Sequence, residues 1–93
     1  MEVKNRNDGQ RGVFYIEDGD KEIALMHYIL AGPAKMIIDH TEVNAEYQGK
    51  GLGLQLVRAG VAYARENHMK ILPLCPFAKK IFDITPAFAD VLF

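Results

Sequence analysis

The segment Gln48-Gly49-Lys50-Gly51-Leu52-Gly53 decides how this sequence is read, because three glycines alternate at the entrance of a helical pattern. Glycine loses more backbone entropy on folding than any other residue, so three of them in one short segment need a physical reason. A helix N-terminus presents unpaired N–H groups and a partial positive charge, and phosphates bind there readily. Lys50 adds a full charge at the same place. The segment is therefore a candidate phosphate-binding loop; the alternative is a glycine-rich turn without a ligand.

A strand–helix–strand unit surrounds this loop. Residues 34–43 (AKMIIDHTEV) predict a strand, residues 44–50 form the polar loop, and the pattern is helical from Gly51 to about Asn67. The apolar stripe of this helix consists of Leu52, Leu56, Ala59, Tyr63 and Ala64. Residues 70–75 (KILPLC) predict a short strand. Two strands joined by one helix are normally parallel.

Two further strands precede this unit. Residues 12–17 (GVFYIE) and 21–30 (KEIALMHYIL) are rich in aromatic and β-branched side chains, and a turn signal separates them, which predicts an antiparallel hairpin. Residues 1–11 are polar, and we expect them to form a flexible lead-in.

The end of the chain predicts a second helix and a docked tail. Pro76 fits the first turn of a helix that stops before Pro86, and residues 87–93 (AFADVLF) are apolar enough to pack on the rest of the protein. We therefore expect residues 1–93 to form one domain of the α/β (α+β) class. Its mixed central sheet has about four strands, with an antiparallel N-terminal hairpin, a parallel βαβ unit and a C-terminal helix.

Composition limits the class of protein. The chain has 93 residues, of which 49% are hydrophobic, and this excludes a disordered chain. Its net charge of −1 argues against a nucleic-acid binder, and its single cysteine excludes an internal disulfide. No apolar run approaches the roughly 18 residues of a membrane span. The polar start does not resemble a signal peptide, so we expect a cytoplasmic protein with no membrane partner.

The glycine spacing does not match two common phosphate loops. The dinucleotide fingerprint requires a further glycine where the chain has Leu54 or Leu56. The P-loop requires glycine at position 44 and Ser or Thr at position 51, where the chain has Asn44 and Gly51. The loop is therefore of another kind.

A family resemblance now becomes visible. The pattern Gln48-x-x-Gly51-x-Gly53 fits the [Q/R]-x-x-G-x-[G/A] signature of the GNAT (GCN5-related N-acetyltransferase) superfamily. Residues 40–43 (HTEV) and 70–78 (KILPLCPFA) resemble the very small, single-domain, YidJ-type group of GNAT-like proteins. The resemblance covers roughly residues 12–92 and implies a minimal GNAT fold.

This resemblance implies acetyl-coenzyme A (acetyl-CoA) or coenzyme A (CoA) as ligand. In the superfamily, main-chain N–H groups of the glycine loop hold the pyrophosphate, and the preceding strand pairs with the pantetheine arm. The loop positions are Gln48, Gly49, Lys50, Gly51, Leu52 and Gly53, and the strand positions are Thr41, Glu42 and Val43. The thioester lies where the two parallel strands separate, which agrees with ligand binding beyond the carboxyl ends of strands in α/β sheets.

Cys75 ends the last predicted strand and immediately precedes a helix. A helix N-terminus favours the thiolate, and a thiolate beside a thioester can accept the acetyl group as a covalent intermediate. Alternatively, Cys75 lines the cofactor slot, or it is a buried and inert small side chain. The resemblance implies a functional role, because a cysteine recurs at this place in the family.

His40 and Glu42 are candidate general bases, because an attacking amine must lose a proton. Histidine suits this role near neutral pH. Strict alternation places His40 and Glu42 on one face of the strand and Thr41 and Val43 on the other, and a bulge would change that assignment. A histidine with an ordinary structural hydrogen bond is the alternative.

The remaining polar residues are weaker candidates for a functional role. His27 is expected in the core or on a sheet face, because its neighbours in alternation are apolar. Lys79 and Lys80 fit a solvated helix face, although Lys79 is a candidate for the 3′-phosphate of the cofactor. The histidines and the cysteine lack metal-ligand spacing, so we expect no metal.

The first functional hypothesis is an acetyl-CoA-dependent N-acetyltransferase, with Cys75, His40 or Glu42 assisting transfer to an amine. Main-chain N–H groups near Val43 are candidates for polarising the carbonyl. Full-length superfamily members carry an N-terminal strand and two helices that form the acceptor side of the cleft, and a chain of this length has no room for most of them. The resemblance therefore implies an acceptor pocket that is shallow, supplied by a partner chain, or absent. The alternatives are a CoA-binding module without efficient catalysis and a structural domain without ligand. We expect a monomer or a weak homodimer.

Overall fold

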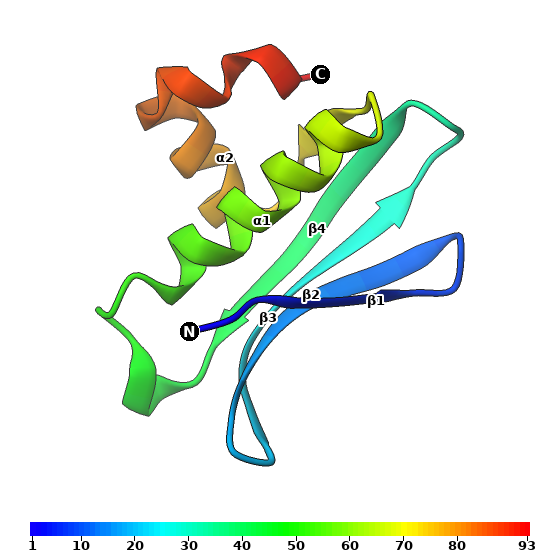
Figure 1. Ribbon diagram of the computed structural model, residues 1–93. Helices are drawn as coiled ribbons and strands as arrows, with labels where there is room; N and C mark the ends of the chain where they lie inside the picture. Colours follow the sequence, from blue (N-terminus) through cyan, green and yellow to red (C-terminus); the bar gives the residue numbers. More distant parts are fainter.

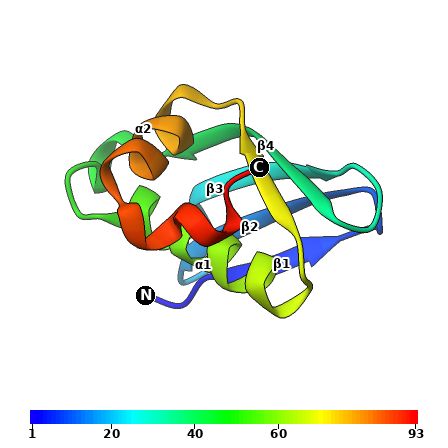
Figure 2. The same cartoon turned by 90° about the horizontal axis from the view of Figure 1, so that it is seen from above.

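The computed structural model describes residues 1–93 as a twisted five-stranded sheet with all helices on one face (Figure 1). The strand order is β1-β2-β3-β4-β5. The strands are β1 (Lys4–Asn7), β2 (Arg11–Asp18), β3 (Lys21–Leu30), β4 (Lys35–Val43) and β5 (Lys70–Pro73). The helical segments are η1 (Ala45–Tyr47), α1 (Leu52–Glu66), α2 (Pro76–Ile84) and η2 (Pro86–Val91). The view from above shows α1, α2 and η2 lying over the sheet (Figure 2), and the side view shows that the opposite sheet face carries no helix (Figure 1).

The predicted mixed α+β class is confirmed, with one strand more than expected. Strands β1 to β4 pair antiparallel with their neighbours, and β4 pairs parallel with β5 across helix α1. The expected hairpin and the expected βαβ unit are therefore both present.

The prediction of a flexible lead-in over residues 1–11 is wrong, because strand β1 lies inside it. All four residues of β1 are exposed, so no alternation of apolar and polar side chains announces a strand. What holds β1 is its pairing with β2 and the Tyr28 hydroxyl, which donates to Asn5 Oδ1 at 2.6 Å and accepts from Asn7 Nδ2 at 3.1 Å. The pKa of Tyr28 is raised above its usual value, mainly because the side chain is buried.

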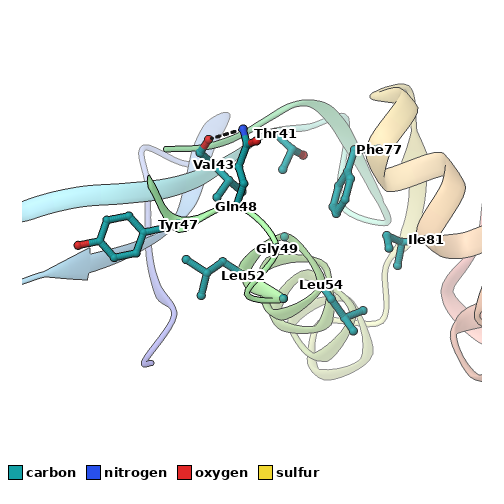
Figure 3. Close-up of a pocket in the computed structure, with 11 residues that line it drawn as sticks. Thr41, Val43, Tyr47, Gln48, Gly49, Leu52, Leu54, Phe77 and Ile81 are labelled. Atoms are coloured by element: carbon teal, nitrogen blue, oxygen red, sulfur yellow. Dashed lines mark hydrogen bonds between the residues drawn. The ribbon is translucent and has the colours of Figure 1, made fainter. Parts of the chain in front are cut away.

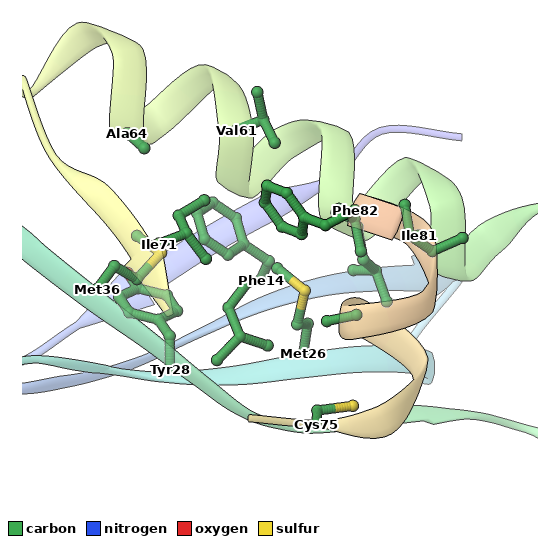
Figure 4. Packing of buried hydrophobic residues seen from close by; sticks show 14 of the residues in the cluster. Phe14, Met26, Tyr28, Met36, Val61, Ala64, Ile71, Cys75, Ile81 and Phe82 are labelled. Atoms are coloured by element: carbon green, nitrogen blue, oxygen red, sulfur yellow. The ribbon is translucent and has the colours of Figure 1, made fainter. Parts of the chain in front are cut away.

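The core lies between the sheet and the helix layer (Figure 4). Phe14 of β2 and Met26 and Tyr28 of β3 face the helix layer and are at most 3% exposed. Of the predicted helix stripe, Ala59 and Tyr63 lie at its edge and are only partly buried, whereas Val57 and Val61 are buried. The buried face differs from the predicted stripe because α1 packs on α2 and η2 as well as on the sheet.

The tail docks, as its apolar composition predicts. Phe88 and Val91 of η2 are buried, and the Phe93 N–H donates to the carbonyl of Ile71 on β5. Arg65 on α1 fastens this segment through two 2.9 Å hydrogen bonds to the carboxylate of Asp90 and one of 2.8 Å to the carbonyl of Ala87. These bonds lower the pKa of Asp90 below its usual value. None of the helices is long and apolar enough to span a membrane.

Candidate functional site

Strands β4 and β5 separate at one point, and this fork is the centre of the candidate site. Their parallel pairing runs from Lys35↔Lys70 to Ile38↔Pro73 and then stops. The N–H groups of Leu74 and Cys75 both donate to the carbonyl of Ile38, at 2.9 and 3.0 Å, as the chain turns away into α2. Strand β4 continues to Val43 with no strand paired on that side. Its edge therefore offers backbone donors and acceptors to a ligand.

A β-bulge determines which β4 residues face the helix layer. The register between β3 and β4 shifts at His27/Tyr28, so that Asp39 becomes the extra residue. Before the bulge the even-numbered Met36 and Ile38 are buried, and after it Thr41 and Val43 turn to the helix side. The sequence alternation for residues 40–43 is correct, but the bulge decides that Thr41 and Val43 are the pair facing the pocket.

The largest hollow of the molecule lies between this edge of β4, the glycine loop and α2 (Figure 3). It is an open pocket of about 460 Å³. Its lining residues are Thr41, Val43, Tyr47, Gln48, Gly49, Gly51, Leu52, Gly53, Leu54, Phe77 and Ile81. The Gln48 side chain donates from Nε2 to the carbonyl of Val43 at 3.3 Å and ties the loop to the end of β4. The volume is within the usual range for small-molecule sites.

The three loop glycines meet two different requirements. Gly49 and Gly51 have positive φ angles, 79° and 77°, and a Cβ on either would meet nothing within 4 Å. They let the backbone turn into α1 while leaving open space beside it. Gly53 instead allows close packing, because a Cβ there would lie 2.4 Å from Cζ of Phe77. The first turn of α1 leaves its N–H groups without helical partners at this open loop.

Cys75 lies at the fork, as its sequence position suggests. It is the N-cap residue of α2, it is 6% exposed, and its Sγ donates to Oγ1 of Thr41 at 3.4 Å. Thr41 lines the pocket, so Cys75 lies directly behind the pocket wall. The hydroxyl on β4 and the thiol at the start of α2 are thus brought together from positions far apart in sequence.

The predicted bases lie elsewhere. His40 and Glu42 project from the sheet face that carries no helix, called the bare face below. Their side chains are 58% and 66% exposed, and Nε2 of His40 lies 3.7 Å from Oε1 of Glu42. Neither lines the pocket, because the bulge directs their neighbours to the helix side.

The two predicted lysines also lie outside the pocket wall. Lys50 extends from the loop, with Nζ 5.5 Å from the ring centroid of Tyr47. Lys79 pairs with Asp83 one helical turn further along α2, at 2.9 Å. A 3′-phosphate role for Lys79 therefore requires this exposed ion pair to open.

Four lining residues are absent from the sequence prediction: Tyr47, Leu54, Phe77 and Ile81. Phe77 and Ile81 come from α2, whose position over the loop is a tertiary feature. Tyr47 donates its hydroxyl to Oδ2 of Asp18 at 2.6 Å, which fixes the start of the loop to the β2–β3 turn and raises the pKa of Tyr47. Of these four residues, only Phe77 had a sequence signal for a place in the pocket wall, because it is an aromatic residue in the first turn of the helix that starts at the fork.

Comparison with known proteins agrees with this geometry. The model of the GCN5-related N-acetyl-transferase family matches residues 13–91. This chain belongs to that family. The match spans the fork, the loop and α2 of this N-acetyltransferase, and it leaves the YidJ-type subgroup as a prediction. No curated protein matches the sequence significantly.

Solved structures include relatives of this N-acetyltransferase. A GCN5-like protein from Staphylococcus aureus, solved by NMR in solution, is 34% identical, with a TM-score of 0.77, and the match covers 99% of this chain and 87% of that one. A ribosomal-protein-alanine N-acetyltransferase from Brucella melitensis has 17% identity and a TM-score of 0.68, covering 82% of this chain and 62% of its own. A GNAT family acetyltransferase from Elizabethkingia anophelis with acetyl-CoA bound has 15% identity and a TM-score of 0.61, covering 69% and 42%. The last two show the shared fold, and this chain spans less than two thirds of each.

Proposed function

We propose that this protein transfers an acetyl group from acetyl-CoA to the amine of an acceptor. The observation that carries the proposal is the fork between β4 and β5, which opens directly into a pocket that ends at a helix N-terminus. A long ligand with a polar diphosphate and a thioester at its other end matches this arrangement in order and in chemistry.

The residues present fit such a ligand. The open space beside Gly49 and Gly51, the free N–H groups of the α1 first turn and the charge of Lys50 suit a diphosphate. The unpaired edge of β4, over Thr41, Glu42 and Val43, offers the backbone hydrogen bonds that an amide-containing pantetheine arm needs. Leu54, Phe77 and Ile81 supply an apolar wall opposite β4.

Acetyl-CoA supplies an activated acyl carbon that an amine attacks. Two routes use the side chains near the fork. In one, the Cys75 thiolate accepts the acetyl group before the amine does, and Thr41 holds its sulfur in place. In the other, the amine attacks directly, and His40 or Glu42 on the bare face receives its proton.

The test is a titration of the ¹⁵N-labelled protein with acetyl-CoA and with CoA, followed by amide NMR and intact mass. We expect shifts centred on residues 41–53 and 73–79. Lys50→Ala should weaken binding several-fold, whereas Lys35→Ala, at the opposite end of β4, should leave it unchanged.

The outcomes separate the possibilities. An adduct of about 42 Da, the mass of one acetyl group, that is lost in Cys75→Ala supports the covalent route. Shifts without an adduct, together with acetylation of an added amine, support direct transfer. Binding without any transfer identifies a CoA-binding module. No shifts at millimolar ligand would refute the proposal.

A further inference from the structure

The bare face of the sheet carries an imidazole–carboxylate pair that the proposed function has not used. His27 on β3 faces away from the helix layer, since its neighbours Met26 and Tyr28 are the buried residues. Its Nδ1 lies 2.6 Å from Oδ1 of Asp39 on β4. The two side chains are 31% and 35% exposed, about half the exposure of His40 and Glu42. This pair is therefore the closer and the less exposed of the two histidine–carboxylate pairs on this face.

Its position relates it to the fork. Asp39 is the extra residue of the β4 bulge, and it is also the first residue after the last β4–β5 pair. Thr41 and Cys75 occupy the helix side of the fork, and the His27–Asp39 pair lies on the bare side. The place where the two strands separate thus has a thiol on one face and an imidazole on the other.

The hydrogen bond fixes the chemistry of the imidazole. An ionised carboxylate only accepts hydrogen bonds, so Nδ1 of His27 carries a proton and Nε2 is the basic nitrogen. A carboxylate on Nδ1 holds the ring in one tautomer and stabilises the imidazolium that forms when Nε2 is protonated. This arrangement aims Nε2 of His27 away from Asp39 and leaves it free to accept a proton.

We propose that His27 accepts the proton of the acceptor amine through Nε2, directly or through one water, and that Asp39 is its positioning residue. The acceptor then approaches the fork from the bare face of the sheet. In the transfer, a nitrogen–carbon bond forms as the carbon–sulfur bond of the thioester breaks. The electron pair leaves on sulfur, and the amine proton passes to Nε2. This inference rests on the proposed function.

Other charged groups surround His27 on this side of the sheet. From β4, these are His40, directly opposite in the register, and Glu42. From β1, β2 and the turn between them, Arg6, Asp8 and Arg11 line the same shallow hollow as His27. Arg6 pairs with Glu22 at 3.4 Å and lies over the ring of Tyr15, so its charge is partly compensated.

The first measurement is the tautomer and titration of His27 by NMR of ¹⁵N-labelled imidazole groups in the full chain. We expect the Nδ1–H tautomer in the wild-type protein and its loss in Asp39→Ala, with the His68 signals unchanged. A wild-type His27 in the Nε2–H tautomer would overturn the proposal without any activity measurement.

The second measurement is the pH dependence of kcat/KM for the acceptor amine at saturating acetyl-CoA, with n-butylamine and spermidine as acceptors. We expect the wild-type profile to rise to a plateau at the NMR titration midpoint of His27. His27→Gln should lower kcat/KM by about 100-fold and remove that limb, in line with general base catalysis. Asp39→Asn should lower it by at least about tenfold. His68→Asn, at the end of α1 with a positive φ of 55°, is the matched control.

The outcomes distinguish this inference from the proposed function. Normal CoA binding and turnover with an unchanged profile in His27→Gln would refute the inference alone. A loss of rate by the same factor at every pH, together with weaker CoA binding, would mean that the pair only clamps the bulge, and this also refutes it. No acetylation of either amine by the wild-type protein would refute both.

Discussion

Replacing Gly53 by alanine tests the close approach of α1 to α2 at the candidate site. An alanine Cβ would lie 2.4 Å from Cζ and 2.7 Å from Cε2 of Phe77. The ring is rigid, so it must rotate as a whole or α2 must shift. Overpacking of this kind costs about 1–3 kcal/mol. Alanine in a helix recovers at most about 1 kcal/mol relative to glycine.

The expected net effect is destabilisation by about 1–2 kcal/mol. For a chain of this size, that lowers the melting temperature by roughly 5–10 °C. Because the sequence has no tryptophan, unfolding is best followed by far-UV circular dichroism in urea. The displaced ring also narrows the pocket, so CoA affinity should fall in the same variant.

A double-mutant cycle makes the reasoning refutable. In a Phe77→Ala background the clash is gone, so Gly53→Ala should change sign and stabilise the protein by up to about 1 kcal/mol. Gly60→Ala is the matched control, since its tightest contact would be the flexible end of Met26, at 3.0 Å, and the next neighbours lie at an ordinary 3.9–4.0 Å. If Gly53→Ala is as stable as the wild type in the native background, the packing argument is wrong.

Three further predictions concern the elements that hold the sheet and the tail. Tyr28→Phe removes the hydroxyl that bonds to Asn5 and Asn7 and should lower the free energy of unfolding by about 1–2 kcal/mol. Amide hydrogen exchange should accelerate in β1 more than in any other strand, and equal acceleration in all strands would contradict this local role. The raised pKa values of Tyr28 and Tyr47 mean that the fold favours the neutral phenols, so stability should be full below about pH 10 and fall as the pH rises further. Urea midpoints across that range should fall less steeply in the Tyr28→Phe/Tyr47→Phe double variant. The lowered pKa of Asp90 means that its carboxylate contributes stability above about pH 4 that is lost on acidification. Arg65→Lys, which keeps the charge without the forked geometry, should reduce this acid sensitivity and loosen residues 86–93, measured by limited proteolysis; an unchanged digestion pattern would count against the anchor.

Several features of this protein followed from sequence patterns alone. The parallel βαβ unit was predictable because a segment with a helical apolar stripe lies between two apolar strands. Parallel neighbouring strands need a long crossover connection, which is usually a helix. The loop at residues 48–53 was predictable because glycines in that spacing satisfy backbone requirements that no other residue satisfies as cheaply. The position of Cys75 at the fork followed from its place between a strand and a proline-led helix.

Strand β1 and the β4 bulge could not be predicted in the same way. The residues of β1 are polar and exposed, and their pairing depends on the neighbouring strand and on the Tyr28 hydroxyl. The bulge is a difference in register between two strands, so no local pattern on β4 records it.

The candidate site likewise has features that the sequence predicts and features that only the tertiary structure reveals. The sequence alone determined where the glycine-rich turn, the charged side chains and the apolar segments lie, because these features depend on residues that are neighbours along the chain. Tertiary structure alone decided that Phe77 closes on Gly53, that Cys75 meets Thr41, and that His27 meets Asp39. Each of these contacts joins residues well separated in sequence, and they form only when packing of the sheet and the helix layer fixes the relative positions of the elements that carry them.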